Sequence, residues 1–324
     1  MVTKMKTTIV IPNYNGKQYL KDCLQSLRQP GNDAHMVVVD NGSTDGSQDY
    51  LRKSFPEVTL IELSENKGFC TAVNIGIRAA RTPYVILLNN DTKVFTDFVY
   101  YLEQAISKSE NIFSVASRMI TMQEPNILDG AGDLYCAFGW AFARKKGKQV
   151  NQAERPCKVF SACGGAAIYR KEIFKRIGLF DENHFAYLED LDIGYRARIY
   201  GYINYYEPKA KVLHAGSGFS GSRYNEFKTS LSSRNNIYVI YKNMPLLQIM
   251  INLPFLLLGF ILKLLFFIRK KMGKTYIKGI CNGILFSFNK SAKEKKIPFS
   301  IDHIRSYIFI QMELWFNIWL RFMN

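Results

Sequence analysis

The sequence predicts an α/β fold in which a sheet is flanked by helices, followed by a C-terminal helical tail that is both apolar and basic. Two observations support this fold class. Short apolar and β-branched runs alternate with segments of helical periodicity over the first 100 residues, as expected for a doubly wound sheet. Beyond Asn243 the composition changes, and long apolar segments alternate with lysine-rich ones.

The first part of the chain is predicted to contain four buried parallel strands. Each is a short apolar run, and a helical pattern separates it from the next. The predicted strands are 8–11, 36–39, 58–63 and 84–88, and the predicted helices are 19–28, 47–54 and 70–80. In an open sheet of this kind, ligands bind beside the carboxyl ends of the strands.

The middle of the chain is less periodic. A helix is predicted over 97–108 and a strand over 113–118, followed by an irregular stretch that reaches Phe160. Regular structure is expected to return at 164–170, with a helix over 171–177.

Two apolar segments dominate the tail. Residues 245–268 approach the length of a bilayer span, but Asn252 and Lys263 interrupt the run, and its basic flank suits anionic headgroups. The second segment, 304–323, keeps several polar residues. We predict attachment in the membrane interface, with buried packing and a true span as the alternatives.

Positive charge is concentrated in the last third of the chain. Residues 203–324 carry 18 Lys and Arg against 5 Asp and Glu, and the whole chain has a net charge of +16. Such a tail favours phosphate-bearing partners, either nucleic acid or an anionic membrane. The six cysteines show no paired motif, and the polar N-terminus resembles no secretory signal, so a cytoplasmic protein is expected.

Polar side chains follow three of the predicted strands at the same edge of the sheet. Asn13 and Tyr14 follow the first strand, Asp40 the second, and Asn89-Asn90-Asp91 the fourth. A nucleotide base needs a ring to stack on and an acceptor for its imide N–H, which Tyr14 and Asp40 can supply. The alternatives are a loop aromatic packed on the sheet and a turn carboxylate, because Asp-Asn-Gly-Ser favours turns.

Carboxylates mark two further places. Asp91 is the anion of its triplet, and Mn²⁺ or Mg²⁺ prefers such oxygen ligands. The cluster Glu189-Asp190-Leu191-Asp192 precedes a helical pattern. These acids either act in catalysis or stabilise a helix N-terminus through its dipole, and Asp192 is expected to pair with Arg196 at i,i+4.

The order of these motifs resembles that of the inverting family 2 glycosyltransferases with the GT-A fold. The resemblance covers residues 6–243 and is carried by the motifs at 11–15, 39–43, 88–92 and 189–192. It implies a GT-A glycosyltransferase domain over 1–243, with a nucleotide-binding half over about 1–100, an acceptor half over about 101–243, and a membrane-associating helical tail over 244–324. The pattern is most similar to the rhamnosyltransferase branch.

The resemblance also implies which residues bind the nucleotide-sugar. Those for the base, the diphosphate and the sugar are Pro12, Asn13, Tyr14, Asp40, Lys67, Asn89, Asn90, Gly164, Gly165 and Arg234. The two glycines would allow close backbone approach, although a tight turn is the plainer reading, and Arg234 is otherwise a surface cation.

The implied metal ligands are Asp91 and His214, and the cofactor is a divalent cation, Mn²⁺ or Mg²⁺. Asn89 stands where the family frequently has Asp, so the triplet supplies less charge and a second ligand is wanted. His214 is alternatively a core or loop histidine. Asp190 is the implied general base that deprotonates the acceptor hydroxyl, and Glu189 helps to orient the acceptor.

The function implied is an inverting, metal-dependent transfer of a sugar from a UDP- or dTDP-sugar, with dTDP-rhamnose as the suggested donor, to a lipid-linked or surface-glycan acceptor. The implied partners are a polyprenyl-diphosphate-linked saccharide and the inner leaflet, with peripheral attachment at the cytoplasmic face and no nucleic acid. One alternative is a sugar nucleotidyltransferase, although its glycine-rich loop is replaced here by Pro12-Asn13-Tyr14-Asn15-Gly16. The other is a non-enzymatic basic protein that binds membrane or nucleic acid, which leaves the acidic clusters unexplained.

Overall fold

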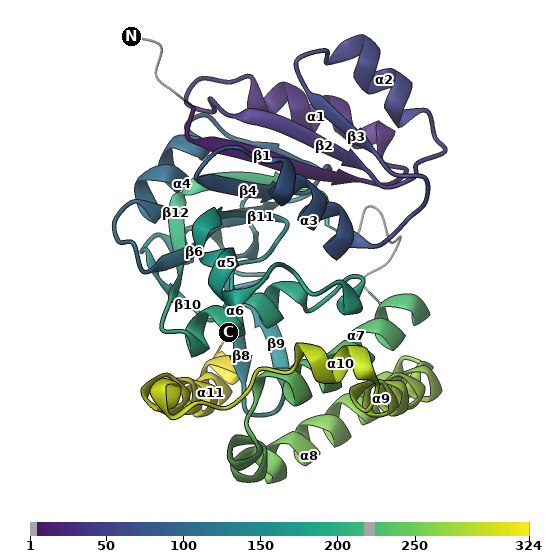
Figure 1. Cartoon of the computed structure of the whole chain (residues 1–324), viewed down its shortest axis with the longest axis vertical. Helices are drawn as coiled ribbons and strands as arrows, with labels where there is room; N and C mark the ends of the chain where they lie inside the picture. The colour runs from purple at the N-terminus through teal and green to yellow at the C-terminus, as the bar shows by residue number, and fades with distance from the viewer. Residues whose placement is uncertain (1–4, 217–223, 324) are drawn as a thin grey trace.

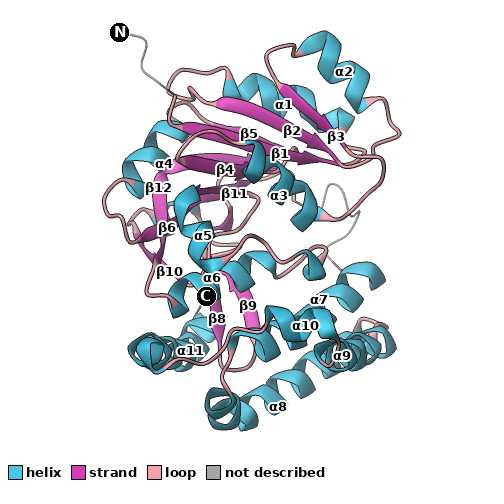
Figure 2. Cartoon of the chain, viewed as in Figure 1, coloured by secondary structure: helices cyan, strands magenta, loops and turns pink. Residues whose placement is uncertain are grey.

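A computed structural model describes residues 5–216 and 224–323 of the chain (Figure 1). The prediction of an α/β fold is confirmed, because helices flank a central sheet (Figure 2). One half of this sheet is parallel, in the order β4-β1-β2-β3. Its strands are β1 (Thr7–Asn13), β2 (His35–Asp40), β3 (Thr59–Glu62) and β4 (Tyr84–Leu88).

Helices cover both faces of this half because each carries an apolar stripe. Side chains of α1, α2 and α4 pack in one hydrophobic cluster and those of α3 in another, with the sheet between them. The bounds are α1 (Lys17–Leu27), α2 (Ser47–Ser54), α3 (Phe69–Ala79) and α4 (Phe98–Ile106). The parallel ladder aligns the strand ends, so Asn13 lies beside Asp40 in register.

The second half of the sheet is mixed, which the sequence did not predict. β11 runs antiparallel between β4 and β6, while β12 is parallel to β6. A short strand, β5, pairs with the end of β12 and sets His214 opposite Thr92. The bounds are β5 (Thr92–Val94), β6 (Ile112–Thr121), β10 (Cys157–Val159), β11 (Ala166–Arg170) and β12 (Ile203–His214).

The stretch expected to be irregular up to Phe160 contains regular structure. It holds β7 (Leu128–Gly130), the 3₁₀ turn η1 (Val150–Ala153), and a hairpin formed by β8 (Asp133–Cys136) and β9 (Trp140–Ala143). Strands of three or four residues are too short to show a clear period of two. The hairpin extends from the sheet toward the helical tail (Figure 1).

The remaining elements before the tail are helical. The helix predicted over 171–177 is divided into η2 (Lys171–Ile173) and α5 (Phe174–Ile177). They are followed by η3 (Glu182–His184), α6 (Glu189–Ile199) and α7 (Glu226–Asn243).

The tail is helical as predicted and lies at the end of the molecule opposite β1–β3 (Figure 1). It contains α8 (Leu246–Arg269), α9 (Gly273–Ser287), α10 (Lys290–Lys295), η4 (Ile301–His303) and α11 (Ile304–Met323). Within the described ranges, α8 is the one helix long and apolar enough to cross a bilayer.

The polar residues of α8 face inward. Gln248, Asn252, Leu256 and Gly259 are its buried residues and lie about one turn apart. Gln248 accepts from the Tyr195 hydroxyl at 2.8 Å, and Asn252 exchanges hydrogen bonds with Gln311 of α11. The helix therefore docks on the domain through a stripe that contains its two amide side chains, and it leaves most of its large apolar side chains exposed.

Candidate active site

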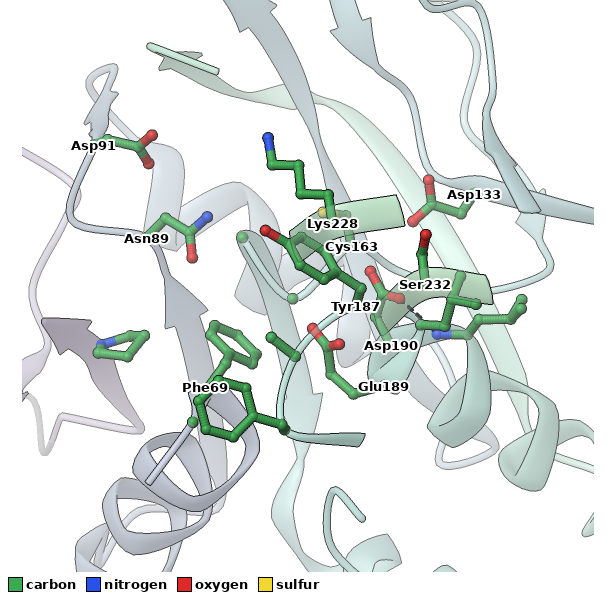
Figure 3. A pocket seen from close by; sticks show the side chains of 18 of the residues that line it. Phe69, Asn89, Asp91, Asp133, Cys163, Tyr187, Glu189, Asp190, Lys228 and Ser232 are labelled. Atoms are coloured by element: carbon green, nitrogen blue, oxygen red, sulfur yellow. Dashed lines mark hydrogen bonds between the residues drawn. The ribbon is translucent and has the colours of Figure 1, made fainter. Parts of the chain in front are cut away.

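A cavity of about 790 Å³ opens where the carboxyl ends of β1 and β4 meet the loop before α6 (Figure 3). Hairpin residues and the first turns of α7 complete its wall. The predicted site residues that line it are Pro12, Asn13, Tyr14, Asn89, Asn90, Asp91, Gly164, Gly165, Glu189, Asp190 and His214. Segments far apart in the sequence thus converge on one pocket.

Hydrogen bonds between side chains join the ends of β1, β2 and β4. Asn13 donates to Asp40 at 2.8 Å and accepts from Asn90 at 2.7 Å. Asp40 is fully buried behind this wall and is not a lining residue, unlike Tyr14. The other carboxylate oxygen of Asp40 accepts hydrogen bonds from the Ser43 backbone N–H at 2.9 Å and from the Gln48 side chain at 2.7 Å. Donors from Asn13, Ser43 and Gln48 therefore already satisfy the Asp40 carboxylate.

Two cationic side chains that the sequence predicted to bind the nucleotide-sugar do not line the pocket. Lys67 has a half-exposed side chain 3.9 Å from Glu65. Arg234 donates to the Asn183 carbonyl at 2.6 Å and stacks over Phe286 of the tail at 4.1 Å. Lys228 of α7 does line the pocket (Figure 3), and burial lowers the pKa of its ammonium group.

Gly165 allows a close approach beside the triplet. The Asn89 backbone N–H donates to the Gly165 carbonyl at 2.8 Å. A Cβ at Gly165 would come within 3.0 Å of the Asn89 amide, whereas one at Gly164 would make an ordinary contact with Phe69. A side chain is therefore disfavoured at Gly165.

Asp91 and His214 meet at one end of the pocket. Asp91 Oδ1 lies 3.3 Å from His214 Nε2, and the other ring nitrogen, Nδ1, lies 2.7 Å from Asp129. Burial opposes the charge on His214, but the two carboxylates outweigh it and raise its pKa to about 9. A carboxylate behind a histidine fixes the ring and directs its far nitrogen, as behind metal-ligating histidines. A divalent cation would have to displace the proton on Nε2, after which the Asp91 carboxylate and the neutral imidazole are ligand types that Mn²⁺ accepts.

A second acidic group lies across the pocket. Ligand atoms of Asp133, Cys163 and Asp190 are within 4.8 Å of one another, a spacing that also suits a cation. Burial raises the pKa of Asp190, although backbone N–H groups of Leu191 and Gly164 oppose the rise. Burial and the charge of Asp190 raise the pKa of Glu189 to about 8. A carboxyl group whose pKa lies near neutral pH can exchange a proton with a hydroxyl.

The loop before α6 has an unusual backbone. Phe185, Tyr187 and Leu188 have φ between 62° and 68°, a left-handed conformation that costs a non-glycine residue about 1–3 kcal/mol. Buried Asn235 of α7 donates its side-chain N–H groups to the carbonyls of His184, Ala186 and Tyr187, at 2.8–2.9 Å. In the motif at 233–236, Asn235 therefore contacts the loop that precedes Glu189 and Asp190.

A buried ionic network ties α6 to α7. Lys242 lies 2.6 Å from Asp181 and 2.9 Å from Asp192, and all three side chains are at most 3% exposed. The predicted pair between Asp192 and Arg196 is present at 2.9 Å. Burial would raise the pKa of Asp192, but Arg196 and Lys242 hold it far below its usual range. The ammonium of Lys242 thus neutralises carboxylates that could otherwise suit a cation.

Sequence reasoning missed several residues of the pocket. Asp129 and Asp133 stand four residues apart around Gly-Ala-Gly in the stretch expected to be irregular, and this small-residue motif was the available signal. An aromatic wall from the start of α3, the hairpin, the loop before α6 and α7 is also new. It comprises Phe69, Phe142, Phe185, Tyr187 and Phe227.

Comparison with known proteins gives a family match and several relatives. The model of glycosyl transferase family 2 matches residues 8–178. The chain is 27% identical to an N-acetylglucosaminyl-diphospho-decaprenol L-rhamnosyltransferase of Mycobacterium tuberculosis, over 64% of this chain and 75% of the relative. It is 25% identical to a teichoic acid poly(glycerol phosphate) polymerase of Staphylococcus epidermidis, over 74% of this chain but 31% of that protein.

Solved structures share the fold at lower sequence identity. GalNAc-T7 with UDP, GalNAc and Mn²⁺ superposes with a TM-score of 0.60 at 18% identity, covering 75% of this chain and 48% of that one. The mannosyltransferase PcManGT from Pyrobaculum calidifontis, in complex with GDP-Man and Mn²⁺, gives 0.54 at 15% identity, covering 96% and 86%. The expectation of a GT-A type sheet is confirmed.

The Asn235 contacts predict a stability effect. Asn235→Ala removes the donors to three carbonyls, and we expect a loss of about 1–3 kcal/mol in the free energy of unfolding. Urea denaturation followed by circular dichroism measures it. Asn282→Ala is the control, because Asn282 is exposed on α9. Equal stabilities of the two variants would show that Asn235 does not hold the loop.

Proposed function

The chain belongs to glycosyl transferase family 2 and is a glycosyltransferase, and from that premise we propose an inverting transfer from a UDP- or dTDP-sugar to a lipid-linked or surface-glycan acceptor. The observation that carries the proposal is the convergence of Tyr14, Asp91 and Asp190 on one pocket. A relative named as a rhamnosyltransferase makes dTDP-rhamnose the first donor to test. Family membership favours sugar transfer over nucleotidyl transfer or a purely binding role.

We assign Asp190 as the general base. Its carboxylate takes the proton of the acceptor hydroxyl while the oxygen attacks the anomeric carbon, and the bond to the diphosphate breaks with its electron pair on the phosphate oxygen. Burial of Asp190 supports this role, because a raised pKa makes a carboxylate a better base. Glu189 lines the same pocket, and its Oε2 is buried with no hydrogen-bond partner among the described residues. We propose that this unsatisfied carboxyl group helps to orient the acceptor.

The opposite side of the pocket would stabilise the leaving diphosphate. Asp91 and His214 would hold a divalent cation, Mn²⁺ or Mg²⁺, which when bound supplies positive charge to the departing nucleotide. Lys228 of α7 adds a cation from the facing wall. Tyr14 and Asn13 bind the base side of the donor, with Asp40 fixing the Asn13 amide.

We further propose that the tail docks in the membrane interface at the cytoplasmic face. Large apolar side chains cover the outer surface of α8 and α11, among them Leu258, Leu265 and Phe316, which are 46–61% exposed. The area is far more apolar than an ordinary soluble surface. Because the domain holds α8 along its inner stripe, a span would draw the hairpin and α6 into the bilayer. Lying in the interface avoids that cost.

A screen of sugar nucleotides tests the proposed activity. The full chain is incubated with UDP- and dTDP-sugars, Mn²⁺ or Mg²⁺, and membrane extract as acceptor. Acceptor-dependent release of the nucleoside diphosphate is the expected result. No release from any donor in either metal would contradict the proposal.

The base assignment predicts a loss of turnover at constant donor affinity. Asp190→Asn removes the proton acceptor with little change in shape, so kcat should fall about 100- to 10,000-fold. The donor dissociation constant should stay within about twofold of wild type. Asp49→Asn serves as the control because that carboxylate is 76% exposed on α2. Normal kcat for Asp190→Asn at saturating acceptor would exclude Asp190 as the base.

The cation assignment predicts a different phenotype for Asp91→Asn. Loss of the anionic ligand should weaken donor binding in Mn²⁺ at least about tenfold, and the variant should need more metal for half-maximal activity. Calorimetric titration of UDP with and without Mn²⁺ measures the first effect, and nucleotide release at increasing Mn²⁺ concentration measures the second. An unchanged gain in affinity on adding Mn²⁺ would place the cation elsewhere in the pocket.

The membrane assignment predicts sensitivity to charge on the outer face of α8. Leu258→Glu with Leu265→Glu should reduce sedimentation with anionic vesicles at least about tenfold, because each carboxylate opposes transfer into the interface. Tyr100→Glu is the matched control, since Tyr100 is 50% exposed on α4. Equal sedimentation of all three proteins would argue against docking through α8.

A further inference from the structure

The β8–β9 hairpin connects the pocket to the tail. Asp133 pairs with Ala143 at the pocket end, where both residues line the cavity. Cys136 pairs with Trp140 at the other end. Three residues of extended strand cover about 10 Å, so Trp140 lies about that far along the hairpin from the acidic group of the pocket.

The tip of the hairpin is seated in the tail helices. The Trp140 indole N–H donates to the Gly259 carbonyl of α8 at 3.1 Å, and the Ala137 N–H donates to the Leu314 carbonyl of α11 at 3.0 Å. A Cβ at Gly259 would come within 2.2 Å of the Phe138 carbonyl oxygen, so α8 approaches the tip closely because this residue is glycine. The tip is therefore held by backbone contacts from two helices.

Two cations share the Trp140 ring at this junction. Lys263 Nζ of α8 lies 5.9 Å from the ring centre, and the Arg321 guanidinium of α11 lies 6.0 Å from it. Arg321 also lies 5.6 Å from the ring of Phe142, a residue of the pocket wall. Across the described part of the chain, neither cation forms an ion pair with an acid, whereas Arg198 in the same region pairs with Glu313.

An anion would complete this arrangement. Like charges that face one ring in apolar surroundings repel each other, and the local dielectric strengthens the repulsion. Apolar side chains flank the pair, with Leu262 39% and Phe322 73% exposed. Phosphate attached to a long apolar chain matches both features, because its charge meets the cations while its chain follows the exposed apolar face.

We propose that Lys263, Arg321 and Trp140 bind the phosphate group of a lipid-linked acceptor, whose sugar then reaches Asp190 along the hairpin. This inference rests on the proposed function and names the place where its acceptor is held. The separation of about 10 Å along the hairpin is one that a sugar joined to a diphosphate can bridge. The site is distinct from Lys228, which serves the donor side.

Binding of farnesyl diphosphate and of farnesol to the full chain in detergent tests the proposal. Excess UDP and Mn²⁺ are present so that the donor side is filled, and calorimetry or quenching of tryptophan fluorescence gives the dissociation constants. We expect the diphosphate to bind at least about tenfold more tightly than the alcohol. Lys263→Gln with Arg321→Gln should abolish that difference. Lys290→Gln with Lys295→Gln, which removes the same charge from α10, should preserve it.

Several outcomes overturn the assignment. Equal affinity for farnesyl diphosphate and farnesol in the wild type would do so, as would full discrimination in the Lys263/Arg321 variant. Competition by phosphatidylglycerol bicelles as strong as that by farnesyl diphosphate would instead identify a general phospholipid site. Arg321→Gln alone, at an exposed position, covers the case in which the double variant fails to fold.

The result is separable from the test of the proposed function. If the diphosphate binds as expected but no sugar nucleotide is consumed, the transfer proposal fails and the phosphate site stands. If nucleotide release depends on a lipid-linked acceptor and the double variant keeps the wild-type KM for it, the phosphate site fails and the transfer stands.

Discussion

The buried charges between α6 and α7 are the constraint on which the pocket depends. Asp192 follows Asp190 by two residues, and its carboxylate is surrounded by Lys242, Arg196 and the Asn243 amide. Buried charges are costly unless they are paired, so α6 has one position in which Asp192 is satisfied. In that position the first turn of α6 presents Glu189 and Asp190 to the cavity. Asn235 holds the left-handed loop that precedes them.

Helix α7 connects the proposed catalytic pocket to the proposed membrane-facing tail. α7 lines the pocket at its start, pairs with α6 near its end, and packs along α9 of the tail between them. The hairpin provides a second link, because its strands line the pocket and its tip contacts α8 and α11. A protein docked through these helices would hold its acceptor at a set distance from Asp190. This geometry suits an acceptor that is confined to a membrane surface.

The sequence predicted the parallel half of the sheet well because its signals are local. Each parallel strand is a buried apolar run, and the polar residue that follows it must lie at the sheet edge. Pro12 to Tyr14 and Asn89 to Asp91 therefore reached the pocket as expected. The carboxylate cluster at 189–192 was equally visible, although its division into Asp190 toward the cavity and Asp192 toward the core was not.

Other features depended on contacts between distant segments. Asp40 and Arg234 have the residue types expected for nucleotide-sugar binding. However, the Asp40 carboxylate already accepts hydrogen bonds from Asn13 and Gln48. The Arg234 guanidinium is held by the Asn183 carbonyl and the Phe286 ring. The mixed order of β6, β11 and β12 was also hidden, because strand pairing is chosen among competing partners.

By itself, the sequence determined the family, the parallel half of the sheet, the residue types at the strand ends, and a helical tail rich in apolar and basic residues. Periodicity and motif order encode these properties over short distances. Only the tertiary structure decided which side of α8 faces the domain, which acids share the pocket, and which cations have no acidic partner among the residues that the structure describes. Those properties are set by packing between segments as far apart as Trp140 and Arg321, and such packing leaves no local pattern.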